Sequence, residues 1–164
     1  NIIYSTEHGP IGGDEFNINF SPNIEKVKNY GWPIASYGEH YGGNKSENKW
    51  KYEKAPLKKS HKKNGFIEPV KYFVPSIGIS EIKKIPKEFN KEFNNDFFIS
   101  SMGTKKEEGD LSIHHLSLDE NLKKIVNHDV IFIGERIRDL KYIKGLNKIL
   151  LFIENSPGLG ILSY

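Results

Sequence analysis

The sequence has no cysteine among its 164 residues, which excludes disulfide bonds and thiolate metal sites. Any metal ion bound by this chain should therefore have oxygen or imidazole ligands. Long apolar runs are also missing, since segments 130–133 and 149–153 are only long enough for strands, and we expect no membrane insertion. With 37% hydrophobic and 12% aromatic residues, the chain can bury one modest core.

Positive charge is unevenly distributed along the chain. The formal net charge is +3, yet residues 44–65 alone hold eight lysines against two glutamates. A nucleic-acid site would need this charge as a patch with aromatic side chains placed for stacking, and Trp50 and Tyr52 are nearby. A segment rich in Lys and Asn between strands is more typical of a solvated loop. We interpret residues 44–65 as a loop excursion and expect no nucleic-acid partner.

Helical periodicity is almost absent, and only residues 24–29 and 119–126 fit a helical turn. Strand-like segments separated by Gly, Pro, Asn and Asp recur at 2–5, 15–20, 33–37, 70–74, 97–101, 111–118, 130–133, 136–143, 149–153 and 161–164. The predicted class is all-β, as a sandwich, a barrel or part of a propeller.

The number of strands limits what a propeller could contain. A blade takes about four strands in roughly 40 to 50 residues, so the chain would supply about three blades as one partial domain over residues 1–164. Three blades cannot close a ring, and their open edges would need either more chain or an identical partner subunit. An apolar pattern is already under way at Asn1 to Ser5, so we expect the chain to start within a fold.

The first segment with chemical content is residues 6–17, Thr-Glu-His-Gly-Pro-Ile-Gly-Gly-Asp-Glu-Phe-Asn, followed by Asn-Tyr-Gly-Trp-Pro at 29–33. Its glycines and proline fold the backbone back on itself and turn carbonyl oxygens outward. Carbonyls beside a carboxylate suit Ca²⁺, which takes about six to eight oxygen ligands. From the residues alone, a tight turn with surface acids is the simpler interpretation.

The same segments resemble a known family. Glu-His-Gly-Pro, Gly-Gly-Asp-Glu-Phe-Asn and Asn-Tyr-Gly-Trp-Pro, in this order, are similar to the central signature of the soluble quinoprotein aldose sugar dehydrogenases of the glucose/sorbosone dehydrogenase family. The resemblance implies that the carbonyls of Gly9 and Pro10 hold a calcium ion that also binds pyrroloquinoline quinone (PQQ). It further implies a second calcium ion bound by Asp14 together with the carbonyl oxygens of Glu15 and Tyr30.

A second motif, Gly-Glu-Arg-Ile-Arg-Asp, begins at residue 134. On a strand Arg136 and Arg138 point to the same face, and two adjacent guanidinium groups favour an anionic partner between them. A ligand with carboxylates fits the planar fork of Arg, while pairing with Glu135, Asp139 or an acid on a neighbouring strand is the alternative. The resemblance implies that both arginines contact the quinone.

Two further segments match the family less closely. Residues 69–80 resemble an aromatic strand that contacts the cofactor, where Tyr72 and Phe73 are the candidates and the expected Trp is missing. Ordinary core alternation would explain both residues as well. The family commonly has a Lys after the strand at 97–101, but here Met-Gly-Thr stands at that place and Lys105 is slightly displaced. Either cofactor binding is weakened or Lys105 reaches in from a longer loop. His114 and His115 should lie on opposite faces of a strand, at the surface.

The resemblance implies about three blades of a six-bladed β-propeller from an enzyme that oxidises the anomeric hydroxyl of an aldose to a lactone. Such an enzyme would be periplasmic or secreted, would use PQQ and Ca²⁺, and would pass electrons to an external acceptor. Its catalytic base, a histidine, would lie upstream of Asn1, so this chain alone should be inactive. The alternative is a non-catalytic, calcium-stabilised propeller that binds a carbohydrate or a protein.

Overall fold

The computed structural model describes residues 1–23, 25 and 27–164, which form two compact units, residues 1–76 and 77–164. The sequence predicted one partial domain over residues 1–164. The turn predicted at 24–29 falls partly outside the described residues. Among the described residues, no helix is long and apolar enough to cross a membrane.

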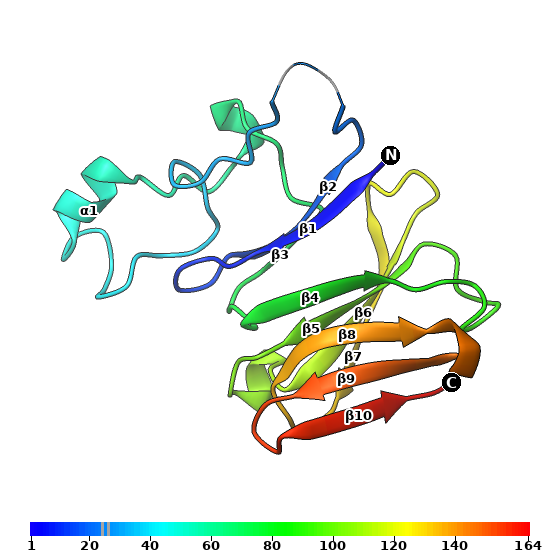
Figure 1. Ribbon diagram of the computed structural model, residues 1–164. Helices are drawn as coiled ribbons and strands as arrows, with labels where there is room; N and C mark the ends of the chain where they lie inside the picture. Colours follow the sequence, from blue (N-terminus) through cyan, green and yellow to red (C-terminus); the bar gives the residue numbers. More distant parts are fainter. Residues whose placement is uncertain (24, 26) are drawn as a thin grey trace. The chain divides into compact units, whose positions relative to one another are not determined.

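Unit 1 contains a three-stranded antiparallel sheet in the order β1 (Ile3–Glu7), β2 (Asp14–Asn19) and β3 (Lys71–Phe73). The central strand β2 is buried on both faces, because Phe16 and Ile18 alternate with Glu15 and Asn17, and all four are at most 6% exposed. Between β2 and β3 the chain makes a long excursion that carries the short helix α1 (Lys49–Lys54) and the 3₁₀ turn Lys62–Asn64 (Figure 1). Polar side chains are thereby brought into the interior of this unit.

The excursion differs from the sequence prediction in two places. Residues 33–37 are a turn rather than a strand, because the carbonyl of Gly31 accepts hydrogen bonds from the amides of Ile34 and Ala35. The only ladder contact of this segment is an isolated bridge from Ala35 to Lys58. The Lys-rich segment 44–65 contains α1, whose single buried residue is Tyr52.

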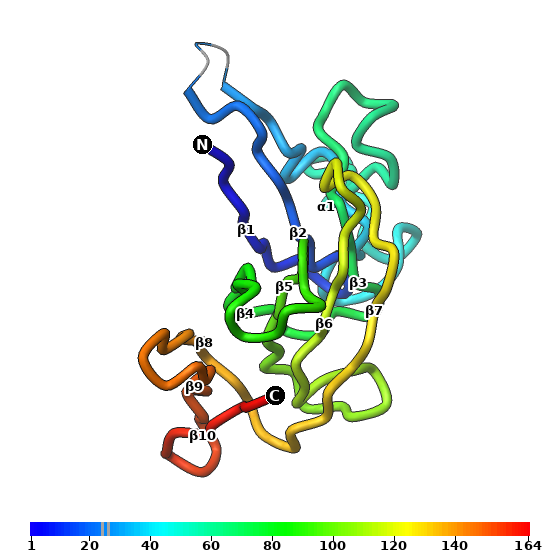
Figure 2. The backbone as a smooth tube through the Cα atoms, turned by 90° about the vertical axis from the view of Figure 1, so that its right-hand side faces the viewer, coloured from blue at the N-terminus to red at the C-terminus, as the bar shows by residue number. Residues whose placement is uncertain are grey.

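Unit 2 contains two antiparallel sheets. The first has the order β4 (Ile79–Lys84), β5 (Asp96–Ser101), β6 (Ser112–Leu118) and β7 (Ile125–Phe132). Figure 2 shows β6 and β7 running side by side. The second sheet has the order β10 (Gly158–Leu162), β9 (Lys148–Ile153) and β8 (Ile137–Ile143). Short 3₁₀ turns occupy Lys106–Glu108 and Lys144–Leu146.

The core of unit 2 joins its two sheets. Its buried side chains are Ile85, Phe89, Phe98, Ile113, Ile137, Leu140, Ile149 and Leu151. Burying side chains of this size stabilises the fold by about 1.5–3 kcal/mol each. Strands β5, β6, β8 and β9 all contribute, so the positions of the loops at the strand ends depend on this cluster.

Two predictions in unit 2 are wrong, and one strand was missed. The helix expected at 119–126 is a turn, because the carboxylate of Asp119 accepts hydrogen bonds from the amides of Lys123 and Lys124 before β7 begins. Strand β4 was not predicted. His114 is only 3% exposed rather than at the surface, and the side chain of His115 is 12% exposed.

The two histidines do lie on opposite faces of β6. The ring of His114 contacts His128 through nitrogen atoms 2.9 Å apart, and its Nε2 lies 2.9 Å from the carbonyl oxygen of Gly109. The ring of His115 lies 2.8 Å from a carboxylate oxygen of Asp96. His114 can be buried, and His115 largely so, because polar groups on the neighbouring strands and loops satisfy their ring nitrogens.

Candidate functional site

The loop between β1 and β2 depends on two glycines. A Cβ atom on Gly9 would lie 2.3 Å from the carbonyl oxygen of Gly12 and 2.4 Å from the carbonyl carbon of Gly13, so only glycine fits. Gly13 has a positive φ of 80° and donates its N–H to the carbonyl of Phe73 in β3. The glycines therefore bring two segments of backbone, with their carbonyl groups, close together.

Asp14 braces this loop from inside. Its side chain is 1% exposed, and its Oδ1 accepts hydrogen bonds from the amide of Gly9 and the hydroxyl of Ser76, both at 2.9 Å. The carbonyl of Pro10 accepts a long 3.4 Å hydrogen bond from the exposed hydroxyl of Tyr41. The buried carboxylate of Asp14 thus helps to hold the Gly9-Pro10 turn in place.

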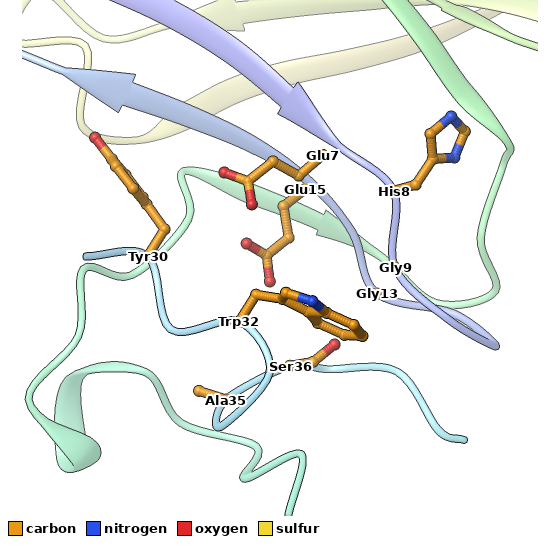
Figure 3. A pocket seen from close by; sticks show the side chains of 9 residues that line it. All are labelled: Glu7, His8, Gly9, Gly13, Glu15, Tyr30, Trp32, Ala35 and Ser36. Carbon is orange, nitrogen blue, oxygen red and sulfur yellow. The ribbon is translucent and has the colours of Figure 1, made fainter. Parts of the chain in front are cut away.

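A small cavity lies between this loop and the turn that follows residue 29. Its volume is about 20 Å³, enough for one water-sized particle. The residues lining it are Glu7, His8, Gly9, Gly13, Glu15, Tyr30, Trp32, Ala35 and Ser36. Figure 3 shows the carboxylates of Glu7 and Glu15 next to one another at the cavity, while the ring of His8 points away. The sequence singled out Glu15 and Tyr30 but not Glu7.

The two carboxylates share a single amide donor. Asn17 Nδ2 lies 2.9 Å from Oε1 of Glu7 and 3.3 Å from Oε2 of Glu15. Burial raises the pKa of Glu15 to about 7, and the negative charges of Glu7 and Glu68 contribute to the rise. Oδ1 of Asn17 is buried and has no hydrogen-bond partner among the described residues. The site is therefore rich in oxygen atoms and poor in positive charge.

His61 is a member of this site that the sequence did not indicate. It lies among the lysines of the excursion, yet it is 1% exposed and its Nε2 is 3.2 Å from Oε1 of Glu15. Its Nδ1 has no hydrogen-bond partner among the described residues and lies 3.8 Å from Glu68. Burial lowers the pKa of His61, so the neutral imidazole is favoured beside Glu15.

Tyr72 and Phe73 lie on opposite faces of β3. The ring of Tyr72 is 43% exposed and stacks on Tyr37 with centroids 3.6 Å apart and planes at 6°. The hydroxyl of Tyr37 donates to Glu68, which fixes this stacked pair. Phe73 is 5% exposed, with the ammonium of Lys71 5.4 Å from its ring centroid. Of the two aromatic candidates, Tyr72 presents a ring at the surface.

Arg136 and Arg138 converge on one carboxylate of the neighbouring strand end, Glu154. Arg136 Nε lies 3.0 Å from Oε2 of Glu154, and Arg138 forms a fork with Nε 2.8 Å from Oε2 and Nη2 2.9 Å from Oε1. These bonds hold the pKa of Glu154 below its usual range, with Arg138 the largest cause. Two cations around one anion leave a net positive site at the start of β8.

Lys105 follows β5 in a loop of its own. Its ammonium pairs with Glu108 at 2.8 Å, and its side chain is 61% exposed. The hydrogen bond that the ammonium donates to Glu108 raises the pKa of Lys105. The loop is closed by Asp110, whose Oδ2 accepts the Lys105 amide at 2.7 Å.

The candidate residues fall into both units. Glycine, proline, acid and aromatic candidates lie in unit 1, whereas Lys105, Arg136 and Arg138 lie in unit 2. The expectation that both groups face one cavity stays a prediction. Within the described residues, no three His, Asp or Glu side chains are arranged to hold a metal ion by themselves, so a cation in unit 1 would also need backbone or water oxygens.

Comparisons with known proteins agree on one family. The family model for glucose/sorbosone dehydrogenases matches residues 1–160. Aldose sugar dehydrogenase YliI of Escherichia coli is 29% identical over 141 residues, which are 86% of this chain and 33% of that protein. An uncharacterized protein of Synechocystis sp. is 30% identical over 139 residues, which are 85% of this chain and 28% of that protein.

Solved structures show the same likeness. The apo form of the soluble aldose sugar dehydrogenase from E. coli aligns with a TM-score of 0.72 and 26% identity over 98% of this chain and 41% of that structure. A crystal structure of a glucose dehydrogenase aligns with a TM-score of 0.71 and 26% identity over 96% of this chain and 40% of that structure. The chain thus spans between 28% and 41% of the length of these relatives.

The three antiparallel sheets and their alignment with solved glucose dehydrogenase structures identify this chain as part of a β-propeller. Because the family model matches residues 1–160, the chain belongs to the glucose/sorbosone dehydrogenase family. The all-β propeller fold and the family resemblance predicted from the sequence are confirmed.

Proposed function

We propose that the chain supplies calcium- and cofactor-binding residues to a PQQ-dependent dehydrogenase that oxidises the anomeric hydroxyl of aldose sugars to lactones. Family membership supports the sugar dehydrogenase activity. The observation that favours the calcium site is the oxygen-rich cavity of unit 1 with Glu7 and Glu15 at its wall. When bound, the quinone supplies the hydride acceptor and calcium a Lewis acid.

The residues of the cavity fit a hard cation. Its two carboxylates share the amide donor of Asn17, whose Oδ1 is buried and has no hydrogen-bond partner among the residues that the structure describes. Burial and neighbouring negative charge raise the pKa of Glu15, and a divalent cation would reverse that cost by favouring the ionised form. Tyr30, whose carbonyl oxygen the resemblance implies as a ligand of the second ion, lines the same cavity. Glu15 would be the central ligand through its carboxylate, whereas the resemblance implies its carbonyl oxygen.

Arg136 and Arg138 fit a carboxylate ligand. Glu154 holds the two side chains together, and each guanidinium has five N–H donors, more than Glu154 uses. Remaining donors can bind the carboxylates of PQQ and orient the ring. The exposed face of Tyr72, held flat by Tyr37, offers a surface for stacking.

Calcium titration of the full-length protein tests the cation site. Glu15→Gln removes the buried charge but keeps the shape, so calcium affinity should fall at least about tenfold. Glu53→Gln removes an exposed charge in α1 of the same unit and should leave the affinity within about twofold. Equal affinities for Glu15→Gln and Glu53→Gln in isothermal titration would refute the site.

Cofactor uptake separates the enzyme from a binding module. The alternative is a non-catalytic propeller that binds carbohydrate or protein. The ion pair between Lys105 and Glu108 favours it, because Glu108 occupies the ammonium group that the resemblance places on the cofactor. Full-length protein with Ca²⁺ and PQQ should bind the quinone and reduce an acceptor dye when an aldose is added. Calcium binding without quinone uptake would instead support the module.

A further inference from the structure

Unit 2 has a cationic groove whose lining includes none of the residues assigned to the proposed dehydrogenase function. Its volume is about 410 Å³, within the range of small-molecule sites. The lining residues are Lys83, Lys84, Pro86, Glu88, Lys141, Tyr142 and Lys144, hereafter the lysine groove. It lies at the ends of β4 and β8, which run side by side in unit 2 (Figure 1).

The charge of the lysine groove is not a general property of unit 2. Residues 77–164 contain thirteen Lys and Arg against thirteen Asp and Glu, so this unit is formally neutral. The groove nevertheless gathers four lysines around one acid, Glu88. Such a concentration of like charge creates a local positive potential that attracts anions.

Internal contacts neutralise little of this charge. Lys141 and Lys144 are exposed, and neither forms an ion pair within the described part of the chain. The Lys83 ammonium is 4.0 Å from Glu81, at the limit of an ion pair. That of Lys84 is 3.4 Å from the amide oxygen of Asn95, a neutral group. At least two of the four ammonium groups can therefore turn toward a ligand.

The scaffold under the groove is rigid. Ile85 follows Lys84 directly and is 1% exposed, and Leu140 precedes Lys141 and is fully buried. The ring of Tyr142 packs edge-on against Phe89 with centroids 6.3 Å apart, and its hydroxyl bonds Asn147 at 2.8 Å. The backbone positions of the lysines are thus set by the core of unit 2, so binding would require ordering of the lysine side chains but little ordering of the backbone.

We propose that the lysine groove binds a small anion carrying two or more phosphate or carboxylate groups. Lys ammonium groups act as point charges for such groups, and the volume suits a ligand of metabolite size. Arg136 precedes β8 whereas Lys144 follows it, which separates the two ends by roughly 20 Å. The inference therefore does not depend on the cofactor site of the proposed function.

Calorimetric titration of the full-length protein at about 0.15 M salt tests this proposal. Tripolyphosphate and citrate are the two probes, and their relative affinity tells a phosphate ligand from a carboxylate one. The double variant Lys141→Gln/Lys144→Gln should weaken the tighter probe by about tenfold, because two exposed ion pairs are lost. The matched control Lys123→Gln/Lys124→Gln removes the same charge from an exposed pair outside the groove and should change the affinity less than about twofold.

Three results would overturn the inference. One is no binding of either probe, and another is an equal loss of affinity in both double variants, which would indicate unspecific attraction. A third is binding of a long heparin fragment alone, which would assign the groove to a macromolecular polyanion. Unchanged thermal unfolding of both variants checks that each is folded.

Discussion

Glu15 joins three properties that rarely occur together in one carboxyl group. It is 6% exposed, it shares its amide donor with Glu7, and its buried neighbour His61 has a lowered pKa and so is mostly neutral at pH 7. Without a cation the ionised form is therefore poorly compensated, which is why its pKa rises to about 7. A group of this kind links the stability of unit 1 both to pH and to calcium.

Ionisation of Glu15 should cost the calcium-free protein stability as pH rises from about 4.5 to about 7, the ordinary and the raised pKa of Glu15, while the lowered pKa of His61 acts in the opposite direction. For Glu15 the folded state binds the proton more tightly than the unfolded state, so its stabilisation is complete below pH 4.5 and is lost as pH rises through 7. A shift of this size corresponds to about 3 kcal/mol. Urea unfolding at several pH values should therefore show the wild type losing stability relative to Glu15→Gln as pH rises through this range. A slope that is unchanged in the variant would assign it to other groups.

Half of the residues of this site could be predicted from the sequence, and the other half could not for a physical reason. Glu15 and Tyr30 belong to recognisable motifs, whereas Glu7 ends β1 and reaches the cavity only through its pairing with Glu15 across the β1–β2 ladder. His61 comes from the long excursion between β2 and β3, where its neighbours in sequence are lysines. Contacts made across a sheet or from a distant loop leave no local pattern.

At the scale of elements, strands with strong apolar alternation were predicted and weaker ones were not. The segment of β5 contains Phe97 and Phe98 and was evident, but β4 has polar residues at most positions and was missed. The helix expected at 119–126 failed because Asp119 caps a turn with its own side chain. Hydrogen bonds from a side chain to the backbone can thus determine whether a segment forms a helix or a turn, which hydrophobic periodicity alone does not.

The close packing of the β1–β2 loop predicts how a substitution of Gly9 affects stability. Gly9→Ala would place a Cβ atom 2.3 Å from a backbone oxygen, so the loop must shift and the protein should lose about 2 kcal/mol or more. Gly145→Ala is the matched control, because its Cβ would meet no atom within 4 Å, and it should change stability by less than about 0.5 kcal/mol. Urea denaturation measures both variants. Similar midpoints for the two would show that the loop is not tightly packed.

For the whole molecule, the sequence established the family and the fold class, because short motifs and a repeating strand pattern are both local. It gave no means of placing Gly9 and Pro10 against Arg136 and Arg138, which are separated by more than a hundred residues and lie in different units. The chain also spans only 41% of a related sugar dehydrogenase. The proposed role in sugar oxidation is for that reason best tested through ligands that bind one unit at a time.

Calcium provides such a test, because it should stabilise the folded protein through the cavity of unit 1 alone. A ligand that binds only the folded state stabilises it by about 2.7 kcal/mol at a concentration one hundred times its Kd. Adding calcium to the chelated protein should therefore raise the thermal unfolding midpoint by several degrees, on the order of 2–8 °C. Magnesium prefers a smaller, more regular shell and should raise it less. The increase should disappear in Glu15→Gln and persist in Glu53→Gln, and its persistence in both would place the calcium ion elsewhere.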